Sequence, residues 1–417
     1  MASSLTSRLV ASFLVMLWSA KLNANGCYPS IISFGDSLAD TGNLKQIASV
    51  SNVDFPCGPP YGQNFIGHAT GRCSNGRLII DFLAESLGLP LIQPYFNVNG
   101  SDGVVGMRQG VNYAVAGATA LDSSFIEASW PEHFLVVNAS LGVQLAWFKQ
   151  SLSSICGNTT SLDCRNFIGR SLILVGEIGG NDYNLPLVTG KSIEEVKSYV
   201  PLVIDTIVLA VNELIKMGAR TLVIPGNFPI GCSAAFLVIY GSRMKEYDPI
   251  TGCLTDLNDF AEYHNQMLQT KLNQIRKLNP DVIVIYADYY NAAMQIYHSP
   301  EEYGFTNAGL KMCYACEGAF NYTSMTCEDE RMTLCEEPDT YISWDGIHLT
   351  EAAYKLISKS LFQGPYTEPE FNSVCRMTST SHSRWHNHRS PEIDSFKTLK
   401  RDEDNSKTHK HHQFDHL

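Results

Sequence analysis

Five short apolar segments rich in β-branched residues recur along this chain, and they constrain its fold more than any other feature. Nearly continuous apolar runs of this length are typical of strands that are buried on both faces of a parallel sheet. The stretches between them are long enough for the crossover helices that parallel strands require. The five segments occupy residues 30–34, 111–116, 171–175, 220–225 and 281–287.

Helical patterns fill the stretches between these segments. One of them opens at a capping box formed by Ser192 and Glu195, and Pro201 is expected to kink it or divide it in two. Strands that alternate with helices predict one α/β domain of three layers, with the sheet between two layers of helices. The predicted helices span residues 76–87, 192–218, 256–278 and 351–362.

The N-terminal residues differ from the rest of the chain. Arg8 precedes an apolar run that is too short to span a bilayer comfortably, and small residues follow it. This pattern predicts a secretory signal peptide over residues 1–24, with cleavage after either Ala20 or Ala24. An uncleaved anchor is the competing interpretation. No second long apolar run follows, so the mature protein is expected to be soluble and without a stable membrane span.

The C-terminal residues also stand apart. Residues 377–417 are rich in charged residues and histidine and poor in apolar residues, which predicts a disordered tail. The folded domain is therefore expected at 25–376. A solvated tail is favoured over a metal-binding segment, because nothing imposes coordination geometry on His409, His411 and His412.

Cysteine usage agrees with secretion. All 12 cysteines follow the predicted signal peptide, in a context that permits disulfides. A local bridge is expected between Cys156 and Cys164. Further local bridges, favoured over a zinc site, are expected among Cys313, Cys316, Cys327 and Cys335. Four sequons predict glycosylation on surface loops at Asn99, Asn138, Asn158 and Asn321.

The net charge limits the partners. A formal charge of −12 argues against nucleic acid, because a binding face must neutralise phosphates. The sequence gives no oligomeric state.

The segment Phe34-Gly35-Asp36-Ser37-Leu38 follows the first apolar run directly, where a helix is expected to begin. Ligands of open α/β sheets bind at the carboxyl ends of the strands, so Ser37 is expected in the active cleft. Its N–H would lie at a helix N-terminus, which favours negative charge. Ser37 is therefore a candidate nucleophile. The competing interpretation is a simple helix N-cap.

A serine nucleophile needs a base, because its hydroxyl is weakly nucleophilic at its free pKa. The candidate base lies near the other end of the chain, in Trp344-Asp345-Gly346-Ile347-His348. The spacing lets the carboxylate of Asp345 reach the imidazole of His348, fix its tautomer and stabilise its protonated form. The competing interpretation of His348 is an exposed loop histidine.

Two more strand ends carry candidate oxyanion donors. Gly117 follows the second apolar run, and its N–H can approach a substrate without obstruction by a side chain. Asn181 follows the third run and offers an uncharged amide donor. A strand-end turn for Gly117 and a turn residue for Asn181 are the competing interpretations. The first three runs thus each end in one catalytic candidate, and the base follows the fifth.

These residues form four ordered blocks, and together they resemble the plant GDSL esterase/lipase family of the SGNH hydrolase superfamily. The resemblance extends over nearly the whole mature chain. The second block departs from the family pattern Ser-Gly-Gly-Ala-Gly, although Gly117 remains, and it resembles a subgroup that contains acetylajmalan esterase and sinapine esterase. The blocks are FGDSLADTGN at 34–43, GVNYAVAGAT at 110–119, GEIGGNDY at 176–183 and WDGIHLT at 344–350.

The resemblance implies the SGNH hydrolase fold, with a five-stranded, parallel, flavodoxin-like sheet between helices. It implies Ser37 as nucleophile, His348 as base and Asp345 as its orienting partner. It assigns the oxyanion hole to Ser37, Gly117 and Asn181. No metal and no organic cofactor are implied. Secretion would place the protein outside the cell, in the apoplast, or in the vacuole.

The expected activity is that of a secreted serine carboxylic-ester hydrolase acting on a small-molecule ester through an acyl-serine intermediate. The subgroup resemblance favours deacetylation or other de-esterification of a plant specialised metabolite such as an alkaloid ester. The alternatives are an acyltransferase using the same site, a cell-wall carbohydrate esterase and a non-catalytic secreted binding protein. A glycosidase is disfavoured, because it needs two carboxylates that flank a sugar.

Overall fold

The computed structural model describes one compact unit. The predicted signal peptide, the predicted tail and the sequons at Asn99, Asn158 and Asn321 lie outside the described residues, whereas Asn138 lies on the exposed surface. The described ranges are 27–51, 57–65, 67–97, 106–125, 138–156, 161–241, 246–306, 310–316 and 332–375.

A seven-stranded sheet forms the centre of this unit, in the order β2-β3-β1-β4-β5-β6-β9. Five of these strands arise from the five apolar segments, are parallel and run in the chain order 2-1-3-4-5, which is the flavodoxin-like order. The predicted fold class is confirmed. The five are β1 (Ile31–Phe34), β3 (Gly110–Asn112), β4 (Leu172–Val175), β5 (Thr221–Pro225) and β6 (Ile283–Ala287).

Two short edge strands widen the sheet beyond the five that the sequence predicts. β2 (Gln93–Pro94) pairs in parallel with β3, and β9 (Thr367–Glu368) pairs antiparallel with β6. Neither has the length of an apolar run, so hydrophobic patterning could not reveal them. A separate two-stranded sheet joins β7 (Tyr314–Cys316) to β8 (Met332–Leu334).

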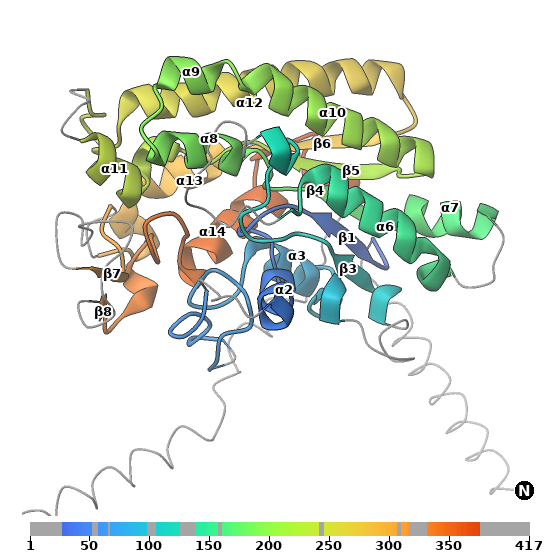
Figure 1. The fold of residues 1–417 in the computed structure, drawn as a ribbon, viewed down its shortest axis with the longest axis horizontal. Coiled ribbons are helices and arrows are strands. Elements are labelled where there is room, and N and C mark those ends of the chain that lie inside the picture. The colour runs from blue at the N-terminus through green and yellow to red at the C-terminus, as the bar shows by residue number, and fades with distance from the viewer. Residues whose placement is uncertain are drawn as a thin grey trace, which may run out of the picture. The chain divides into compact units, whose positions relative to one another are not determined.

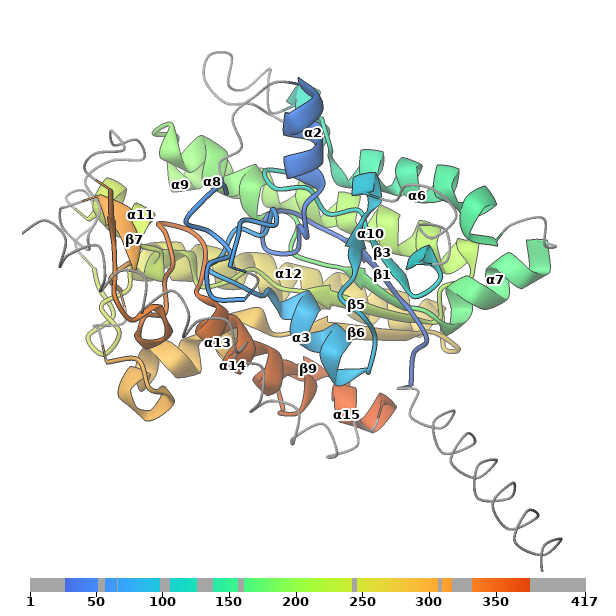
Figure 2. The same ribbon diagram turned by 90° about the horizontal axis from the view of Figure 1, so that it is seen from below.

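Helices cover both faces of the sheet, as Figures 1 and 2 show together. One layer contains α3 (Ile79–Ser86), α13 (Tyr289–His298) and α14 (Glu351–Phe362), and the other contains α6 (Leu141–Cys156), α10 (Val200–Met217) and α12 (Thr255–Leu278). Further helices of the described residues are α2 (Asn43–Ser51), α7 (Ser161–Arg170), α8 (Gly180–Val188), α9 (Ile193–Lys197), α11 (Ala234–Tyr240) and α15 (Phe371–Val374).

The helix signals in the sequence act largely as expected. The hydroxyl of Ser192 accepts a hydrogen bond from the Glu195 N–H and starts α9, and Pro201 lies in the first turn of α10, so the predicted stretch is divided in two. Thr350 caps α14, which has the predicted bounds. The helix expected at 76–87 begins three residues later, because the carboxylate of Asp81 accepts from the Leu78 N–H and fixes the start there.

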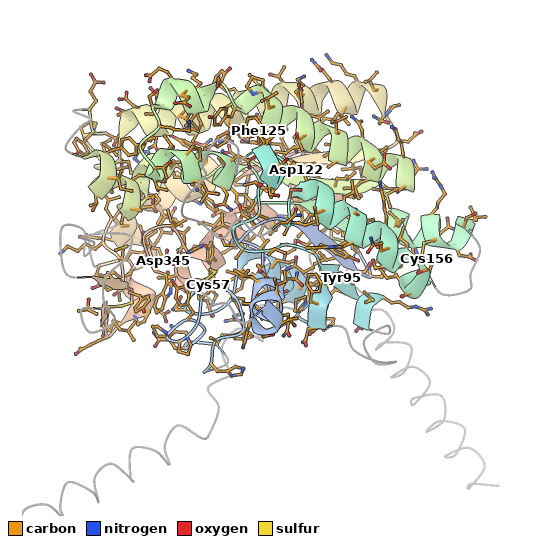
Figure 3. All side chains as sticks on the ribbon, viewed as in Figure 1. Cys57, Tyr95, Asp122, Phe125, Cys156 and Asp345 are labelled. Carbon is orange, nitrogen blue, oxygen red and sulfur yellow. A yellow bond between two sulfur atoms is a disulfide. The ribbon has the colours of Figure 1, made fainter. Side chains whose placement is uncertain are left out.

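Five disulfides stabilise the described region. Cys156–Cys164 and Cys313–Cys335 are among the expected local bridges, and Cys27–Cys375 joins residues 348 positions apart. Cys57–Cys73 and Cys232–Cys253 complete the set. Figure 3 labels Cys57 and Cys156. The side chain of Cys316 and all of Cys327 lie outside the described part of the chain.

A buried ion pair connects the loop after α2 to α3. Nε and Nη2 of Arg72 each lie 2.7 Å from an oxygen of the Asp81 carboxylate, and the two side chains are 6% and 0% exposed. Nη1 of Arg72 also donates to the Thr41 carbonyl and the Thr70 hydroxyl. Because both charges are desolvated, each depends on the other.

We expect Asp81→Ala to lower the free energy of unfolding by about 3–5 kcal/mol, because it leaves the Arg72 charge buried without its partner. Urea unfolding with the disulfides intact measures the change. The control is Asp205→Ala, which removes an exposed ion pair with Lys271 and should change stability by less than about 1 kcal/mol. Equal unfolding midpoints for the two variants would contradict the role of this ion pair.

Candidate active site

Ser37 lies in a tight turn that directly follows β1. The turn is closed by a hydrogen bond from the Asp40 N–H to the Asp36 carbonyl oxygen, at 2.9 Å. Gly35 has φ of +152°, and a β-carbon there would lie 2.1 Å from the Gly176 carbonyl oxygen, so only glycine fits. The side-chain amide of Gln144 donates to the Gly35 carbonyl and accepts from its N–H. The position of Ser37 is thus fixed from both sides of the turn.

The expectation that Ser37 opens a helix is wrong. Helix α2 begins only at Asn43, because the buried carboxylate of Asp40 accepts hydrogen bonds from the N–H groups of Gly42, Asn43 and Leu44 and caps the helix there. Ser37 therefore sits in a turn that precedes the helix. No described residue accepts a hydrogen bond from its N–H.

The imidazole of His348 lies between Ser37 and Asp345. Its Nε2 is 2.9 Å from the Ser37 Oγ, and its Nδ1 is 2.7 Å from Oδ2 of Asp345. When Nδ1–H donates to the carboxylate, Nε2 keeps a lone pair that accepts from the serine hydroxyl. The structure thus brings together the three side chains that the sequence predicts as a triad.

The Asp345 carboxylate is saturated with donors. Its Oδ1 accepts from the N–H groups of Ile347 and His348, at 2.8 and 2.6 Å. Its Oδ2 also accepts from the Tyr61 hydroxyl, at 2.9 Å. Tyr61 packs edge-on against Tyr314 and Trp344. Tyr61 had no predicted role, since it lies 284 residues from Asp345 and no rule of sequence spacing connects these two residues.

The charges of the pair reinforce each other. Burial raises the pKa of Asp345, but the charge of His348 and the hydrogen bonds from its ring and backbone outweigh burial, and the pKa lies below its ordinary value. Burial lowers the pKa of His348, and the Asp345 carboxylate raises it by more than burial lowers it. The pKa of His348 therefore lies above its ordinary value. The imidazolium is therefore stabilised relative to a free histidine.

Gly117 and Asn181 lie on loops that contact the turn of Ser37 through neighbouring residues. Gly117 has φ of +82°, a β-carbon there would contact nothing within 4 Å, and no described residue accepts from its N–H. The amide Nδ2 of Asn181 donates to the Ala118 carbonyl at 2.9 Å, and its other hydrogen has only a long contact, 3.4 Å, with Oδ2 of Asp36. The Ser37 and Gly117 N–H groups thus have no acceptor among the described residues, and Asn181 has one amide contact that is long.

Buried carboxylates connect the loops that carry these donors. Oδ2 of Asp40 also accepts from the Ala116 N–H, which ties the Ser37 turn to the Gly117 loop. The Asp182 carboxylate accepts from the N–H groups of Ala120 and Leu121, which ties the Asn181 loop to the same segment. Burial raises the pKa of Asp182 to about 7, and the two backbone donors oppose this effect. The sequence blocks contain both aspartates, but spacing alone did not indicate these contacts.

The other described histidines do not join the site. His264 is buried, bonds to the Tyr183 hydroxyl and has its pKa lowered to about 3 by burial, which fits the structural role predicted for it. Within the described ranges, no group of three histidine, cysteine, aspartate or glutamate side chains is placed to hold a metal ion.

Similarity to known proteins identifies the family of this chain. The family described as GDSL-like Lipase/Acylhydrolase matches residues 31–361. The chain belongs to this family, and it is a carboxylic ester hydrolase of the GDSL esterase/lipase type.

Particular relatives come from Arabidopsis thaliana. The chain is 49% identical to GDSL esterase/lipase At1g28580 over 358 residues, covering 85% of this chain and 90% of that protein. It is 51% identical to GDSL esterase/lipase At1g31550 over 351 residues, covering 84% and 87%. A solved structure of a mutant acetyl-xylooligosaccharide esterase from Geobacillus covers 81% of this chain and 94% of its own at 13% identity, with a TM-score of 0.33.

The disulfides and the helices of the structure bear on the compartment in which the protein is found. The disulfides fit a secreted protein, because they persist in oxidising compartments. Among the helices of the described ranges, none combines the length and the apolar character needed to cross a membrane.

We expect His348 to titrate above about 6.5, the ordinary value for histidine, because the Asp345 carboxylate favours the imidazolium. In Asp345→Asn the charge is gone and the pKa of His348 should fall below the wild-type value. In Tyr61→Phe the carboxylate loses a donor, attracts the imidazolium more strongly and should raise that pKa. NMR titration of the imidazole measures all three.

The matched control for this titration is Asp339→Asn, an exposed aspartate outside the triad. It should leave the His348 titration in place. A wild-type pKa of His348 below the ordinary value, or one that Asp345→Asn does not lower, would contradict the electrostatic coupling.

Proposed function

We propose that this protein is a serine esterase in which Ser37 is the nucleophile, His348 the general base and Asp345 the group that orients the base. The observation that carries the proposal is the continuous hydrogen-bonded chain from the Ser37 hydroxyl through both imidazole nitrogens to the carboxylate. Nucleophile, base and orienting group within hydrogen-bond reach are the signature of an activated serine.

In the first step, Oγ of Ser37 forms a bond to the ester carbonyl carbon while Nε2 of His348 takes its proton. The resulting oxyanion accepts hydrogen bonds from the N–H groups of Ser37 and Gly117 and from the Asn181 amide. The bond between the carbonyl carbon and the alkoxy oxygen then breaks, and the protonated Nε2 of His348 gives its proton to that oxygen, so the alcohol leaves. Water attacks the acyl-serine with His348 again as base, which releases the acid and restores Ser37.

The free donors support this oxyanion hole. The N–H groups of Ser37 and Gly117 have no acceptor among the described residues, and one hydrogen of the Asn181 amide is held only weakly by Asp36. The hydrogen bond from the Asn181 amide to the Ala118 carbonyl holds that side chain in place. Donors that are fixed before the reaction need no reorganisation when charge develops.

The substrate in this proposal is a small ester, with an acetyl ester of a plant specialised metabolite, such as an alkaloid, as the preferred class. The subgroup resemblance of the second sequence block supports this choice. Secretion after removal of residues 1–24 is part of the proposal, and the disulfides support it. Glycosylation is proposed at Asn138, which is exposed, and at the other three sequons.

We expect Ser37→Ala to abolish hydrolysis of a short-chain aryl acetate, because the nucleophile is lost. A serine-directed phosphonate should label the wild type and not the variant, while both give the same circular dichroism spectrum. Product analysis with an added alcohol separates hydrolysis from acyl transfer. Full activity in Ser37→Ala would overturn the assignment of the nucleophile.

We expect Asn181→Ala to lower kcat by about a hundredfold or more, because one oxyanion donor disappears. The KM should change much less, since the donor acts mainly on the transition state. Asn273→Ala, an exposed position on α12, serves as the control and should leave kcat unchanged. An unchanged kcat in Asn181→Ala would mean that Asn181 only supports the loop.

A further inference from the structure

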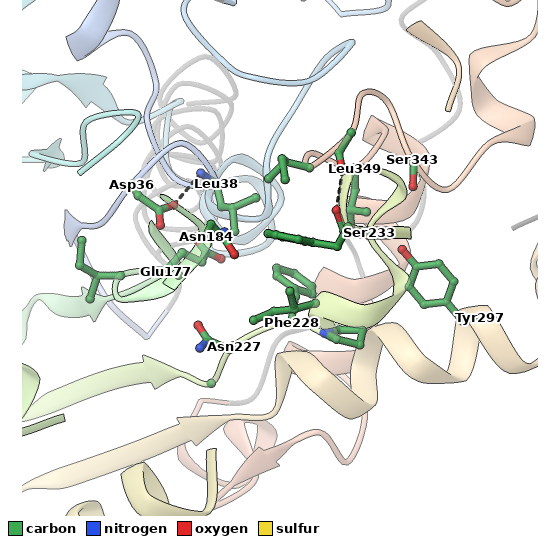
Figure 4. Close-up of a pocket in the computed structure, with 18 residues that line it drawn as sticks. Asp36, Leu38, Glu177, Asn184, Asn227, Phe228, Ser233, Tyr297, Ser343 and Leu349 are labelled. Carbon is green, nitrogen blue, oxygen red and sulfur yellow. Dashed lines mark hydrogen bonds between the residues drawn. The ribbon is translucent and has the colours of Figure 1, made fainter. Parts of the chain in front are cut away.

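A cavity of about 80 Å³ adjoins the triad (Figure 4). Its lining includes residues next to the proposed catalytic groups: Leu38 follows Ser37, Ile347 and Leu349 flank His348, and Gly180 precedes Asn181. Its volume is about half that of a cavity that accommodates benzene. A short group of a few heavy atoms therefore fits beside the reacting ester.

The two ends of this cavity differ in chemistry. Figure 4 shows Glu177, Asn184 and Asn227 gathered near Asp36 at one end, with Tyr297 and Ser343 toward the other and Phe228 between them. The wall around Phe228 is apolar. Small-molecule sites commonly combine such a wall with a few convergent polar groups that decide which ligand fits.

Three polar atoms at this end are buried and have no partner among the described residues. They are Oε1 of Glu177, Oδ1 of Asn184 and Nδ2 of Asn227. The two amide groups lie near each other, since a β-carbon on Gly180 would lie 3.7 Å from Nδ2 of Asn184 and 3.9 Å from Oδ1 of Asn227. Each of these atoms shares a carbon with one of the unpaired atoms. Buried polar atoms are nearly always satisfied, so three unsatisfied ones around one cavity point to a ligand.

Glu177 is held in place as a hydrogen-bonding group. Its backbone has φ of +36°, a conformation that side-chain-bearing residues rarely adopt. The Tyr289 side chain interacts with its carboxyl group, whose Oε1 has no partner among the described residues. Burial raises the pKa of Glu177 to about 8, so the group is mainly protonated at neutral pH. A protonated carboxyl group can donate one hydrogen bond, and its Oε1 has no partner among the described residues.

We propose that Glu177, Asn184 and Asn227 form a subsite that binds a hydroxyl group on a short part of the ester substrate. A hydroxyl oxygen accepts two hydrogen bonds and donates one. It would accept from the Glu177 carboxyl and the Asn227 amide and donate to the Asn184 carbonyl oxygen. This subsite rests on the proposed esterase function and names the substrate class for it.

Other groups match these atoms less well. An alkyl chain would leave all three atoms unpaired. A carboxylate would find no cation, since the described lining contains no lysine, arginine or histidine. An ammonium group has no acceptor for the Asn227 amide hydrogen. A site built to bond a hydroxyl rejects the analogue that lacks it by several orders of magnitude, because its own polar groups are left unpaired.

The test compares matched ester pairs that differ by one hydroxyl. In the first pair, aryl propanoate and aryl 3-hydroxypropanoate, the hydroxyl is in the acyl group. In the second, ethyl acetate and 2-hydroxyethyl acetate, it is in the alcohol. The ratio of kcat/KM within each pair is measured, and we expect the hydroxylated ester to be favoured at least tenfold in one of them. The pair that responds shows which side of the ester enters the subsite.

The variants are Asn227→Leu, which keeps the size of the side chain and removes the amide, and Glu177→Gln. We expect Asn227→Leu to reduce the ratio of kcat/KM between the hydroxylated and the unsubstituted ester at least tenfold. The decrease should come mainly from the kcat/KM of the hydroxylated ester. Ile230→Val changes the apolar wall of the same cavity and is the matched control. It should alter both members of a pair by the same factor.

A ratio near one in both pairs for an active wild type, or a preference that Asn227→Leu leaves unchanged, overturns the subsite. Failure of the proposed function looks different, because then no ester of either pair is hydrolysed. The dissociation constants of the same four esters with Ser37→Ala, measured from NMR chemical-shift changes, test the subsite without turnover. Tighter binding of a hydroxylated ester there supports it, and equal binding within both pairs overturns it.

Discussion

The buried carboxylate of Asp40 is the contact on which the arrangement of the site depends. It accepts hydrogen bonds from the N–H groups of Gly42, Asn43 and Leu44 at the start of α2, and from the Ala116 N–H after β3. Backbone donors buried at a sheet edge need acceptors, and one side chain supplies them for two loops. It acts together with the hydrogen bond from the Val115 N–H to the Gly35 carbonyl, which joins the same two segments.

Burial of the triad works against its charges, and the local hydrogen bonds decide the outcome. Asp345 is taken out of water, which favours its neutral form, yet four donors keep it ionised. Asp36 and Glu177 lie nearby with fewer donors, and burial raises their pKa values to about 7 and about 8. Asp345 thus has a lower pKa than Asp36 and Glu177, because more hydrogen-bond donors contact its carboxylate.

The five apolar runs and the end signals were enough to predict the parallel sheet, its layers and the bounds of α14. They also led to the prediction that Ser37, Gly117, Asn181 and His348 lie along one edge of the sheet, because parallel strands end together. The sequence could not reveal β2 and β9, which are too short to show a pattern, or the start of α2, which a side chain sets. The contact of Tyr61 with Asp345 could not be predicted, because it exists only in the folded chain.

The polar end of the cavity and the oxyanion donors are not independent. Oδ2 of Asp36 contacts the Asn181 amide, at 3.4 Å, and would lie 3.9 Å from a β-carbon on Gly180, the point where the Asn184 and Asn227 amides also converge. The backbone of Asp36 donates to the Glu177 carbonyl, at 2.9 Å. A group bound among these side chains would therefore lie near Asp36, which also contacts the Asn181 amide. Binding energy from a remote group of the substrate can in this way position the donors around the developing oxyanion.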